Sequence, residues 1–281
     1  MTPSLFAPDE LLAIARTVAV EAGALILEAR RGAVSVAAAK SSSVDVVTQV
    51  DRDAEALIRG RLAELRPGDG FFGEESGAEG GTSGLTWVVD PIDGTVNYLY
   101  GIPHYAVSIA VVEGEPDPQS WRAVAGVVIN PASGELYTAT AGGGAFLGGQ
   151  SLRIADAVSL EQSLLATGFA YRAETRAEQG AAVARLLPHV RDIRRMGTAS
   201  LDLCAVASGR VNAYFERTLN PWDHAAGALI ATEAGAAVEG MPGARADHRF
   251  TLAAHPSAIA ALRTLLAEAG AQPAAELGTT D

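Results

Sequence analysis

Two aspartates three residues apart, Asp90 and Asp93, come directly after an apolar segment of the sequence. Residues 85–89 have the composition of a buried strand, and Pro91 cannot donate to a strand ladder, so we expect the strand to end at Asp90. Both carboxylates can then face one pocket, where the Ile92 carbonyl is free to turn inward. Hard oxygen donors grouped in this way are typical of a site for divalent metal ions.

The alternative for this segment is a strand that ends in an Asp-Gly turn, formed by Asp93 and Gly94. Two further acids favour a site over a simple turn. Glu74, which stands between glycines after an aromatic pair, can supply a third carboxylate, although a solvated turn is also open. Asp223 lies in the first turn of an expected helix, where it can act as a ligand or complement the helix dipole.

Residues 48–51, Thr-Gln-Val-Asp, read as a capping box with Asp51 in the place of the usual glutamate. An aspartate held at a helix start can also accept a hydrogen bond from a catalytic hydroxyl. Thr95 offers such a hydroxyl. We therefore expect that Asp51 can combine a structural role with a catalytic one.

The bulk composition narrows the possible functions. The 281 residues are 48% hydrophobic and 19% charged, which suits one large domain or two lobes that share a core. The 33 acids and 21 bases give a net charge of -12, which argues against non-specific binding to nucleic acid or to an anionic membrane. Phosphorylated substrates would also be repelled, so a carboxylate site that holds phosphate requires divalent cations.

Cysteine usage and hydropathy predict a soluble, cytoplasmic protein. Cys204 is the only cysteine, which excludes an internal disulfide and structural zinc sites of the cysteine type. We expect it to be a packed small side chain. The first ten residues lack a basic region followed by an apolar core, and no apolar run approaches the ~20 residues of a membrane span.

Periodicity predicts helices and antiparallel strands in the first half. Helical spacing begins at Pro8 and continues until Gly32 ends it. A short strand at 44–47 and a second helix at 51–65 follow. Strand patterns then occupy 85–89, 105–112, 123–129 and 135–140, separated by turns rich in glycine and proline.

The second half alternates strands with helices. We expect strands at 164–167, 193–195, 211–215 and 251–254, and helices at 173–187, 200–208, 222–234 and 257–269. The chain is predicted to form a single unit over 1–281, made of a lobe at 1–150 and a lobe at 151–269. Their boundary should lie near Gln150 and Ser151, and a disordered tail is expected over 270–281.

Together the motifs resemble the inositol monophosphatase family, and its bacterial members in particular, within the lithium-sensitive, metal-dependent sugar-phosphatase superfamily. The resemblance covers nearly the whole chain. Its matching elements are Lys40 with residues 44–51, residues 73–76, residues 87–95 with Asn97, residues 197–199 and residues 222–227. It implies a mixed fold, α+β or α/β, arranged as the layered α/β/α/β/α sandwich of inositol monophosphatases and fructose-1,6-bisphosphatases.

The resemblance implies a complete metal and phosphate site. Up to three Mg2+ ions are expected, with Mn2+ as a substitute and Li+ and Ca2+ as inhibitors. Their implied ligands are Glu74, Asp90, the Ile92 carbonyl, Asp93 and Asp223. The substrate phosphate would bridge the metals and accept hydrogen bonds from the backbone N–H groups of Gly94 and Thr95. A metal-bound water, activated by Glu74 and by Thr95 backed by Asp51, would attack phosphorus directly, without a phosphoenzyme.

The alcohol of the substrate must be recognised elsewhere. Glu216 falls where inositol monophosphatases of the family carry an acid that binds ring hydroxyls, although an exposed charge at a strand end is the alternative. With the matching Gly197, Thr198 and Ala199, it favours a polyol over an adenosine bisphosphate or histidinol phosphate. The implied substrate-binding residues are Asp93, Gly94, Thr95, Gly197, Thr198, Ala199, Glu216 and Asp223.

Two further residues have less defined roles. In relatives, the loop that contains Lys40 covers the metals, so this lysine could steer or screen anions, or simply be solvated. His224 follows Asp223 directly and could support the site, but packing or exposure is the plainer explanation. None of the five histidines lies in a recognisable catalytic motif.

We therefore predict an Mg2+-dependent phosphomonoester hydrolase that converts inositol 1-phosphate to inositol and phosphate and is inhibited by Li+. The resemblance implies a homodimer with no nucleic-acid or membrane partner. One alternative is a family phosphatase for histidinol phosphate, fructose 1,6-bisphosphate, NADP or 3'-phosphoadenosine 5'-phosphate. Another is a regulatory binding protein with residual phosphatase activity, but the intact ligand set favours catalysis.

Overall fold

The computed structural model describes residues 7–32, 36–39 and 46–273 of the chain. Its helices are α1 (Pro8–Ala29), α2 (Gln49–Leu65), α3 (Thr95–Tyr100), α4 (Ala173–Leu186), α5 (Ala199–Ala207), α6 (Pro221–Glu233) and α7 (Ile259–Glu268). Two 3-10 turns lie at Leu160–Gln162 and Leu187–His189. None of the helices in the described ranges combines the length and the apolar composition that a membrane span requires.

The strands form one small and two large sheets. The small sheet pairs β1 (Val36–Ala39) with β2 (Val46–Thr48). The first large sheet contains β3 (Gly70–Gly73), β4 (Gly77–Glu79), β5 (Leu85–Asp93), β6 (Ala106–Glu113), β7 (Arg122–Asn130), β8 (Glu135–Thr140), β9 (Gly144–Leu147) and β10 (Gln150–Ser151). The second contains β11 (Leu164–Thr167), β12 (Asp192–Arg194), β13 (Ala213–Glu216), β14 (Ala237–Glu239) and β15 (Thr251–Ala254).

The two large sheets differ in topology. The eight-stranded sheet has the order β10-β9-β8-β7-β6-β5-β3-β4, and only the β3–β5 pair in it is parallel. The five-stranded sheet has the order β12-β11-β13-β15-β14, with β11 parallel to both of its neighbours. The lobe boundary proposed near Gln150 coincides with β10, the last strand of the first sheet.

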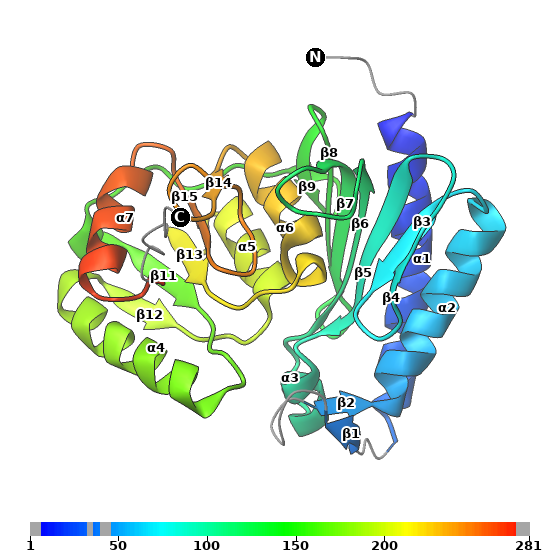
Figure 1. Cartoon of the computed structure of the whole chain (residues 1–281), viewed down its shortest axis with the longest axis horizontal. Coiled ribbons are helices and arrows are strands. Elements are labelled where there is room, and N and C mark those ends of the chain that lie inside the picture. The colour runs from blue at the N-terminus through cyan, green and yellow to red at the C-terminus, as the bar shows by residue number, and fades with distance from the viewer. Residues whose placement is uncertain (1–6, 33–35, 40–45, 274–281) are drawn as a thin grey trace, which may run out of the picture.

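Helices and sheets alternate in five layers (Figure 1), which confirms the predicted sandwich. Helices α1 and α2 cover the outer face of the eight-stranded sheet, α5 and α6 lie between the sheets, and α4 and α7 cover the outer face of the five-stranded sheet. Side chains alternate along β5, so Trp87 packs on α1 and α2 whereas Val88 joins the core around α5 and α6. Every residue of β5 is buried, because both faces of its sheet are covered.

The middle layer is packed without room for larger side chains. All nine residues of α5 are buried. A Cβ atom on Gly227 of α6 would lie 2.9 Å from the Leu203 side chain of α5, and one on Gly126 of β7 would lie 3.1 Å from the Cα of Ala226. Close approach of these backbones fixes α6 against both the eight-stranded sheet and α5.

Most predicted elements are confirmed, with shifts of a few residues at their ends. One prediction was wrong: the strand does not end at Asp90 but continues to Asp93. The β5–β6 register shifts between Asp90 and Asp93, and Pro91 lies in this bulge, where its missing N–H leaves the ladder intact. The patterns did not predict β1, β3, β4, β9, β10, β14 or α3.

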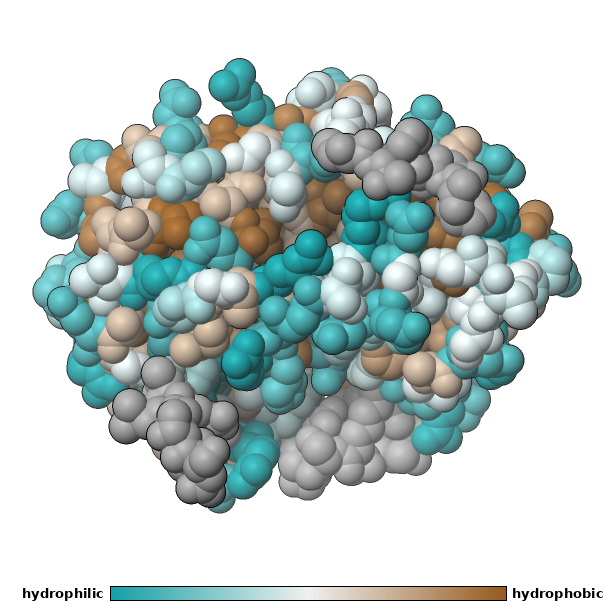
Figure 2. All heavy atoms as spheres, turned by 45° about the horizontal axis from the view of Figure 1, so that its top comes forward, coloured by the Kyte–Doolittle hydropathy of each residue, from teal (hydrophilic) through white to brown (hydrophobic). Residues whose placement is uncertain are grey.

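The surface is largely hydrophilic on the face drawn in Figure 2, where apolar side chains form smaller patches among polar ones. Of the predicted tail, residues 270–273 are described, and Ala271 is buried in the core beside α4 and α7. The remainder of that segment, 274–281, lies outside the described residues.

Candidate active site

A cavity of about 380 Å3 brings together residues from both halves of the chain. It contains every predicted metal ligand and every predicted substrate-binding residue. These lining residues are Glu74, Asp90, Ile92, Asp93, Gly94, Thr95, Gly197, Thr198, Ala199, Glu216 and Asp223. Lys40, which the resemblance places over the site, lies outside the described residues.

Thr95 and Asp51 are in contact behind the cavity. The Thr95 hydroxyl lies 3.1 Å from Asp51 Oδ1 and 3.0 Å from the Ile92 carbonyl oxygen, and its single proton can be donated to either. The predicted capping box is confirmed, since the Asp51 N–H donates to the Thr48 hydroxyl oxygen (3.4 Å) and the Thr48 N–H donates to Asp51 Oδ2 (2.8 Å). The Thr48 hydroxyl also donates to Asp51 Oδ2 (2.5 Å). Burial raises the pKa of Asp51, although these hydrogen bonds oppose the shift. Asp51 is thus held rigidly with one oxygen facing Thr95.

Glu74 is carried by a short turn between β3 and β4. The turn is fixed at two points: the Glu74 N–H donates to the Val89 carbonyl (3.2 Å), and the Glu75 N–H donates to Glu55 Oε2 (2.8 Å). The Glu55 carboxylate is 3% exposed and occupies the space where a Cβ atom on residue 73 would lie. Glycine at position 73 therefore lets Glu55 anchor the turn.

Sequence reasoning missed Glu55. Its position four residues after Asp51 puts both acids on one face of α2, and that spacing was a usable signal. Both carboxylates point from the same helix face toward the ends of β3 and β5, so α2 positions two parts of the candidate site at once.

We expect Glu55→Ala to lower stability and weaken the site, because it removes the acceptor that the part-buried Glu75 N–H uses. The free energy of unfolding should fall by about 1–3 kcal/mol. Urea denaturation measures this loss, and the Mg2+ concentration for half-maximal activity should rise in parallel. Glu55→Gln is the matched control, because its amide oxygen can still accept the hydrogen bond. Equal losses in the two variants would contradict the anchoring role.

Asp90 and Asp93 are held in different ways by the β5 bulge and by α5. The Ile92 N–H donates to Asp90 Oδ1 (3.0 Å), which closes the bulge. The N–H of Ser200 (2.7 Å) and its hydroxyl (2.5 Å) both donate to Asp93 Oδ2. The Ala199 N–H also donates to this carboxylate, and Asp93 lines the cavity. Ser200 is a second residue that the sequence patterns did not identify.

Asp223 is both a helix cap and a lining residue of the cavity. It completes a capping box at the start of α6, where the Asn220 N–H donates to Asp223 Oδ2 (2.6 Å), and it also lines the cavity. Trp222 packs edge-on against Phe72 of β3, with ring centroids 5.2 Å apart. This contact ties the start of α6 to the strand that precedes Glu74.

Two glycine-containing loops meet on the floor of the cavity. Gly94 has φ +92°, and a Cβ atom there would lie 2.5 Å from Thr198 Oγ1, so only glycine fits. The Asn97 side-chain amide donates to the carbonyls of His104 and Met196, both at 2.8 Å. Asn97 thereby clamps the start of α3 to the loop that leads into α5.

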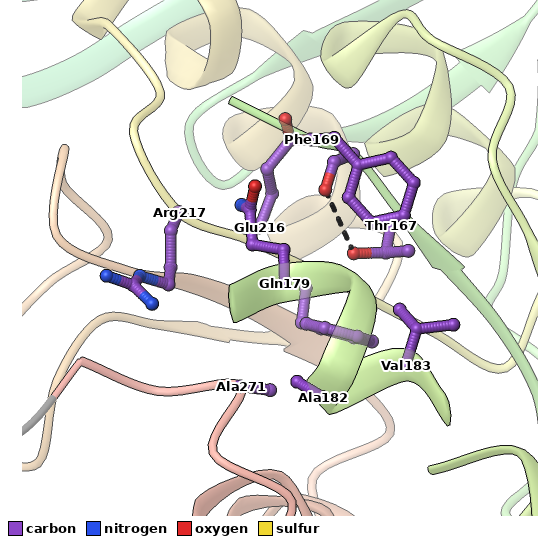
Figure 3. Close-up of a pocket in the computed structure, with 10 residues that line it drawn as sticks. Thr167, Phe169, Gln179, Ala182, Val183, Glu216, Arg217 and Ala271 are labelled. Atoms are coloured by element: carbon purple, nitrogen blue, oxygen red, sulfur yellow. Dashed lines mark hydrogen bonds between the residues drawn. The ribbon is translucent and has the colours of Figure 1, made fainter. Parts of the chain in front are cut away.

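Glu216 is not an exposed charge at a strand end, and that alternative was wrong. The Tyr214 hydroxyl donates to Glu216 Oε2 (2.7 Å), and the carboxylate lies directly against Gly168. Burial raises the pKa of Glu216 to about 7, while Tyr214 and Arg195 oppose the shift. A second, smaller cavity of about 10 Å3 lies beside it, and Figure 3 shows Arg217 extending away from the other lining side chains.

The lining of the main cavity also includes basic residues that the sequence patterns did not identify: Arg172, Arg195 and His248. The Arg195 guanidinium lies 5.8 Å from the centre of the Phe169 ring. Burial raises the pKa values of Asp93 and Glu216, and the positive charge of Arg195 opposes both shifts. The cavity is therefore lined by acids and guanidinium groups together.

His224 and Cys204 have the packing roles predicted for them. His224 is buried near the Trp121 ring, and burial lowers the pKa of the imidazole to about 4, so it is neutral at physiological pH. Cys204 is a free, fully buried thiol in α5.

The buried acids fit a metal site by their chemistry. Burial raises the pKa of Asp90 and of Asp223 far above the usual range, and neighbouring negative charges add to both shifts. Among the described residues, no arginine or lysine forms an ion pair with Asp90, Asp93 or Asp223. Like charges gathered out of water require either protons or cations, and all of the donors are hard oxygens.

In their present positions, these carboxylates do not form a complete coordination shell for a metal ion. In the described part of the chain, no three Asp, Glu, His or Cys side chains lie at metal-coordinating distances. Asp90 shares a hydrogen bond with Glu74, which places a proton between the two acids. Metal binding therefore requires loss of this proton and small movements of the side chains.

Comparison with known proteins agrees with the fold. The model of the inositol monophosphatase family matches residues 7–277. An inositol-1-monophosphatase of Mycobacterium leprae is 45% identical over 252 residues, which cover 83% of this chain and 84% of that protein. The Nus factor SuhB of Escherichia coli is 41% identical over 245 residues, with coverages of 86% and 88%. A crystal structure of the extragenic suppressor protein SuhB from Bartonella henselae superimposes with a TM-score of 0.84 at 34% identity, covering 92% of this chain and 98% of that one.

The five-layered fold and the carboxylate-lined cavity, together with these relatives, define a phosphatase. The chain belongs to the inositol monophosphatase family.

Proposed function

We propose that the protein hydrolyses inositol 1-phosphate to inositol and phosphate and that it requires Mg2+. One observation carries this proposal: the cluster of buried carboxylates and the alcohol-recognising candidate Glu216 line the same cavity. The first group suits the phosphate end of a phosphomonoester when cations are bound. The second suits a hydroxyl-rich leaving group, because a carboxylate accepts hydrogen bonds from alcohols.

Glu74, Asp90, the Ile92 carbonyl, Asp93 and Asp223 would hold the divalent ions. Bound there, such ions supply positive charge to the phosphate and lower the pKa of a nearby water. Within the protein, the Thr95 hydroxyl can accept a hydrogen bond from the attacking water while Asp51 accepts the Thr95 proton, and Glu74 can take the proton of the water. The water oxygen forms a bond to phosphorus as the bond from phosphorus to the alcohol oxygen breaks, and the leaving oxygen takes a proton from solvent water to become the alcohol.

The alcohol end of the substrate is assigned to the second sheet. Glu216, fixed by Tyr214 and Gly168, can accept hydrogen bonds from ring hydroxyls. Backbone groups at Gly94 and Thr95 lie at the opposite end and can donate to the phosphate. The substrate is thus oriented from both sides of the cavity.

A regulatory role is the second candidate function, because the Escherichia coli relative is named as a Nus factor. Other phosphomonoesters remain alternative substrates, including histidinol phosphate and fructose 1,6-bisphosphate. A homodimer, inhibition by Li+ and a cytoplasmic location are part of the same proposal, and all three are open to direct measurement.

The decisive experiment is phosphate release from a panel of phosphomonoesters, with Mg2+, with a chelator, and with Mg2+ plus Li+. We expect inositol 1-phosphate to be the best substrate, chelation to abolish turnover and Li+ to inhibit it. No release from any ester would overturn the phosphatase proposal and leave the regulatory role. Faster turnover of histidinol phosphate would refute the inference from Glu216.

Glu216→Gln provides the matched specificity test on the same panel. The amide keeps the shape but replaces a charged acceptor with a neutral one, so kcat/KM for inositol 1-phosphate should fall by about 10–100-fold. Turnover of p-nitrophenyl phosphate, which has no ring hydroxyls, should change little. An equal loss on both esters would assign Glu216 to the phosphate end instead.

A further inference from the structure

Asp202 is a buried acid that the proposed mechanism does not use. It lies in the first turn of α5, and its side chain is 1% exposed. Neither of its carboxyl oxygens has a hydrogen-bond partner among the described residues. The dipole of α5 favours an acid at this position, but it does not require the acid to be buried without a partner. Unpartnered polar groups at this depth are rare and costly.

Strand geometry places Asp202 beside the groups that support Glu216. Tyr214 and Glu216 are two residues apart in β13, so their side chains leave the same face of the sheet. Tyr214 packs in the core that contains α5, whereas the intervening Phe215 joins the core on the other side. Asp202 therefore lies in the layer onto which Tyr214 and Glu216 project.

A second buried polar side chain without a hydrogen-bond partner among the described residues lies on the same face of the sheet. Thr251 of β15 pairs directly with Glu216, so its side chain leaves the sheet beside that acid. The Thr251 hydroxyl is also buried without a partner in the described structure. Asp202 and Thr251 thus add two unsatisfied polar side chains to the surroundings of the Tyr214–Glu216 hydrogen bond.

On the basis of the proposed function, in which Glu216 binds the alcohol, we infer that Asp202 is a positioning residue. Its buried carboxyl group holds the Tyr214–Glu216 pair in the orientation that reaches the substrate. The Tyr214 hydroxyl donates its proton to Glu216, so the lone pairs of the phenol oxygen are free to accept. Asp202 makes no direct hydrogen bond among the described residues, so we place an ordered water between its carboxyl group and that oxygen.

The electrostatics agree with a donor at Asp202. Burial raises the pKa of Asp202 well above its usual range, the charges of Glu216 and Asp93 raise it further, and Arg195 opposes the shift. Both effects favour the protonated form of the carboxyl group, which is the form that can donate a hydrogen bond. A chain of donors from Asp202 through Tyr214 to Glu216 would make each hydrogen bond in it stronger.

The test compares Asp202→Leu with the near-isosteric Asp202→Asn, using inositol 1-phosphate and p-nitrophenyl phosphate with Mg2+. For Asp202→Leu we expect KM for inositol 1-phosphate to rise by about tenfold, the effect of losing one hydrogen bond, with kcat and both constants for p-nitrophenyl phosphate nearly unchanged. Asp202→Asn keeps a neutral donor and should behave like the parent. The melting temperature of Asp202→Leu should change little, because removal of a buried polar group offsets the loss of its water-mediated hydrogen bond.

A double variant separates positioning from general disruption. In the Glu216→Gln background, Asp202→Leu should cause no further rise in KM, because both substitutions act on one interaction. Equal losses on both esters, a lowered melting temperature with no change in specificity, or additive effects in the double variant would overturn the inference.

Two further outcomes distinguish this inference from the proposed function. If Glu216→Gln alone leaves the preference for inositol 1-phosphate intact, the proposed alcohol site is wrong and the inference falls with it. If Glu216→Gln removes the preference and Asp202→Leu does not, only the role of Asp202 is wrong. Should Asp202→Leu fail to fold, Tyr214→Phe interrupts the same chain and must raise KM for inositol 1-phosphate alone.

Discussion

Asp93→Asn is expected to reduce phosphate release by more than ~10²-fold, since even residues behind a metal ligand contribute 10–100-fold. The local hydrogen bonds dictate how the amide will sit. The Ser200 N–H donates to Asp93 Oδ2 and can only donate, so the amide oxygen must take that position. The NH2 group is then turned into the cavity, where it has no lone pair for a cation. Steady-state phosphate release measures the loss.

A thermal melt tests the same variant without reference to activity. Mg2+ should raise the melting temperature of the parent, because a ligand that binds only the folded state stabilises it. Asp93→Asn should lose most of this shift while its melting temperature without Mg2+ is retained. Asp69→Asn is the matched control: Asp69 is also an acid held by hydrogen bonds, to Trp87 and Arg66, but it lies outside the cavity. A full Mg2+ shift in Asp93→Asn would contradict its assignment as a ligand.

Thr95→Val is expected to lower kcat by about 10²–10⁴-fold, the range for loss of a group that helps move a proton. Valine has nearly the same shape as threonine but lacks the hydroxyl that links Asp51 to the cavity. The backbone N–H of residue 95 is unchanged, so KM should change far less than kcat. Steady-state kinetics with inositol 1-phosphate separates the two constants.

Thr95→Ser is the control for this prediction. Serine keeps the hydroxyl and loses only a methyl group, so most of kcat should be retained. A kcat that falls equally in the serine and valine variants would indicate a packing role for Thr95. A rise in KM with an unchanged kcat would assign Thr95 to substrate binding alone.

The sequence predicted elements with strong periodicity and missed those whose form depends on neighbours. The long helices α1 and α2 were clear because their apolar residues repeat at helical spacing over many turns. Strands β3 and β4 are short and rich in glycine, and α3 spans only six residues. Such segments carry too few side chains for a pattern.

The end of β5 was predicted wrongly for a related reason. A proline normally ends a central strand, and the prediction followed that rule. The structure instead accommodates Pro91 in a register shift against β6, and the pairing resumes at Asp93. Only the partner strand, which is distant in sequence, determines this outcome.

The residues of the candidate site were predicted from sequence motifs, but several of the residues that hold them in place were not. The motif residues are local in sequence and could be read directly. The supports join distant segments: Ser200 contacts Asp93 across 107 residues, and Glu55 contacts the backbone of Glu75 across 20. A serine or a glutamate in a helix carries no sign of such a partner until the fold is known.

The placement of the cavity between two sheets has an evolutionary consequence. The candidate groups for hydrolysis are carried mainly by β5, its bulge and the turn after β3, whereas Glu216 and Tyr214 belong to β13 in the other sheet. Under the proposed function, substitutions along β13 can therefore change the accepted alcohol without altering the strand that carries the acids. Descendants of one ancestral hydrolase could acquire new substrates by mutation of a single layer.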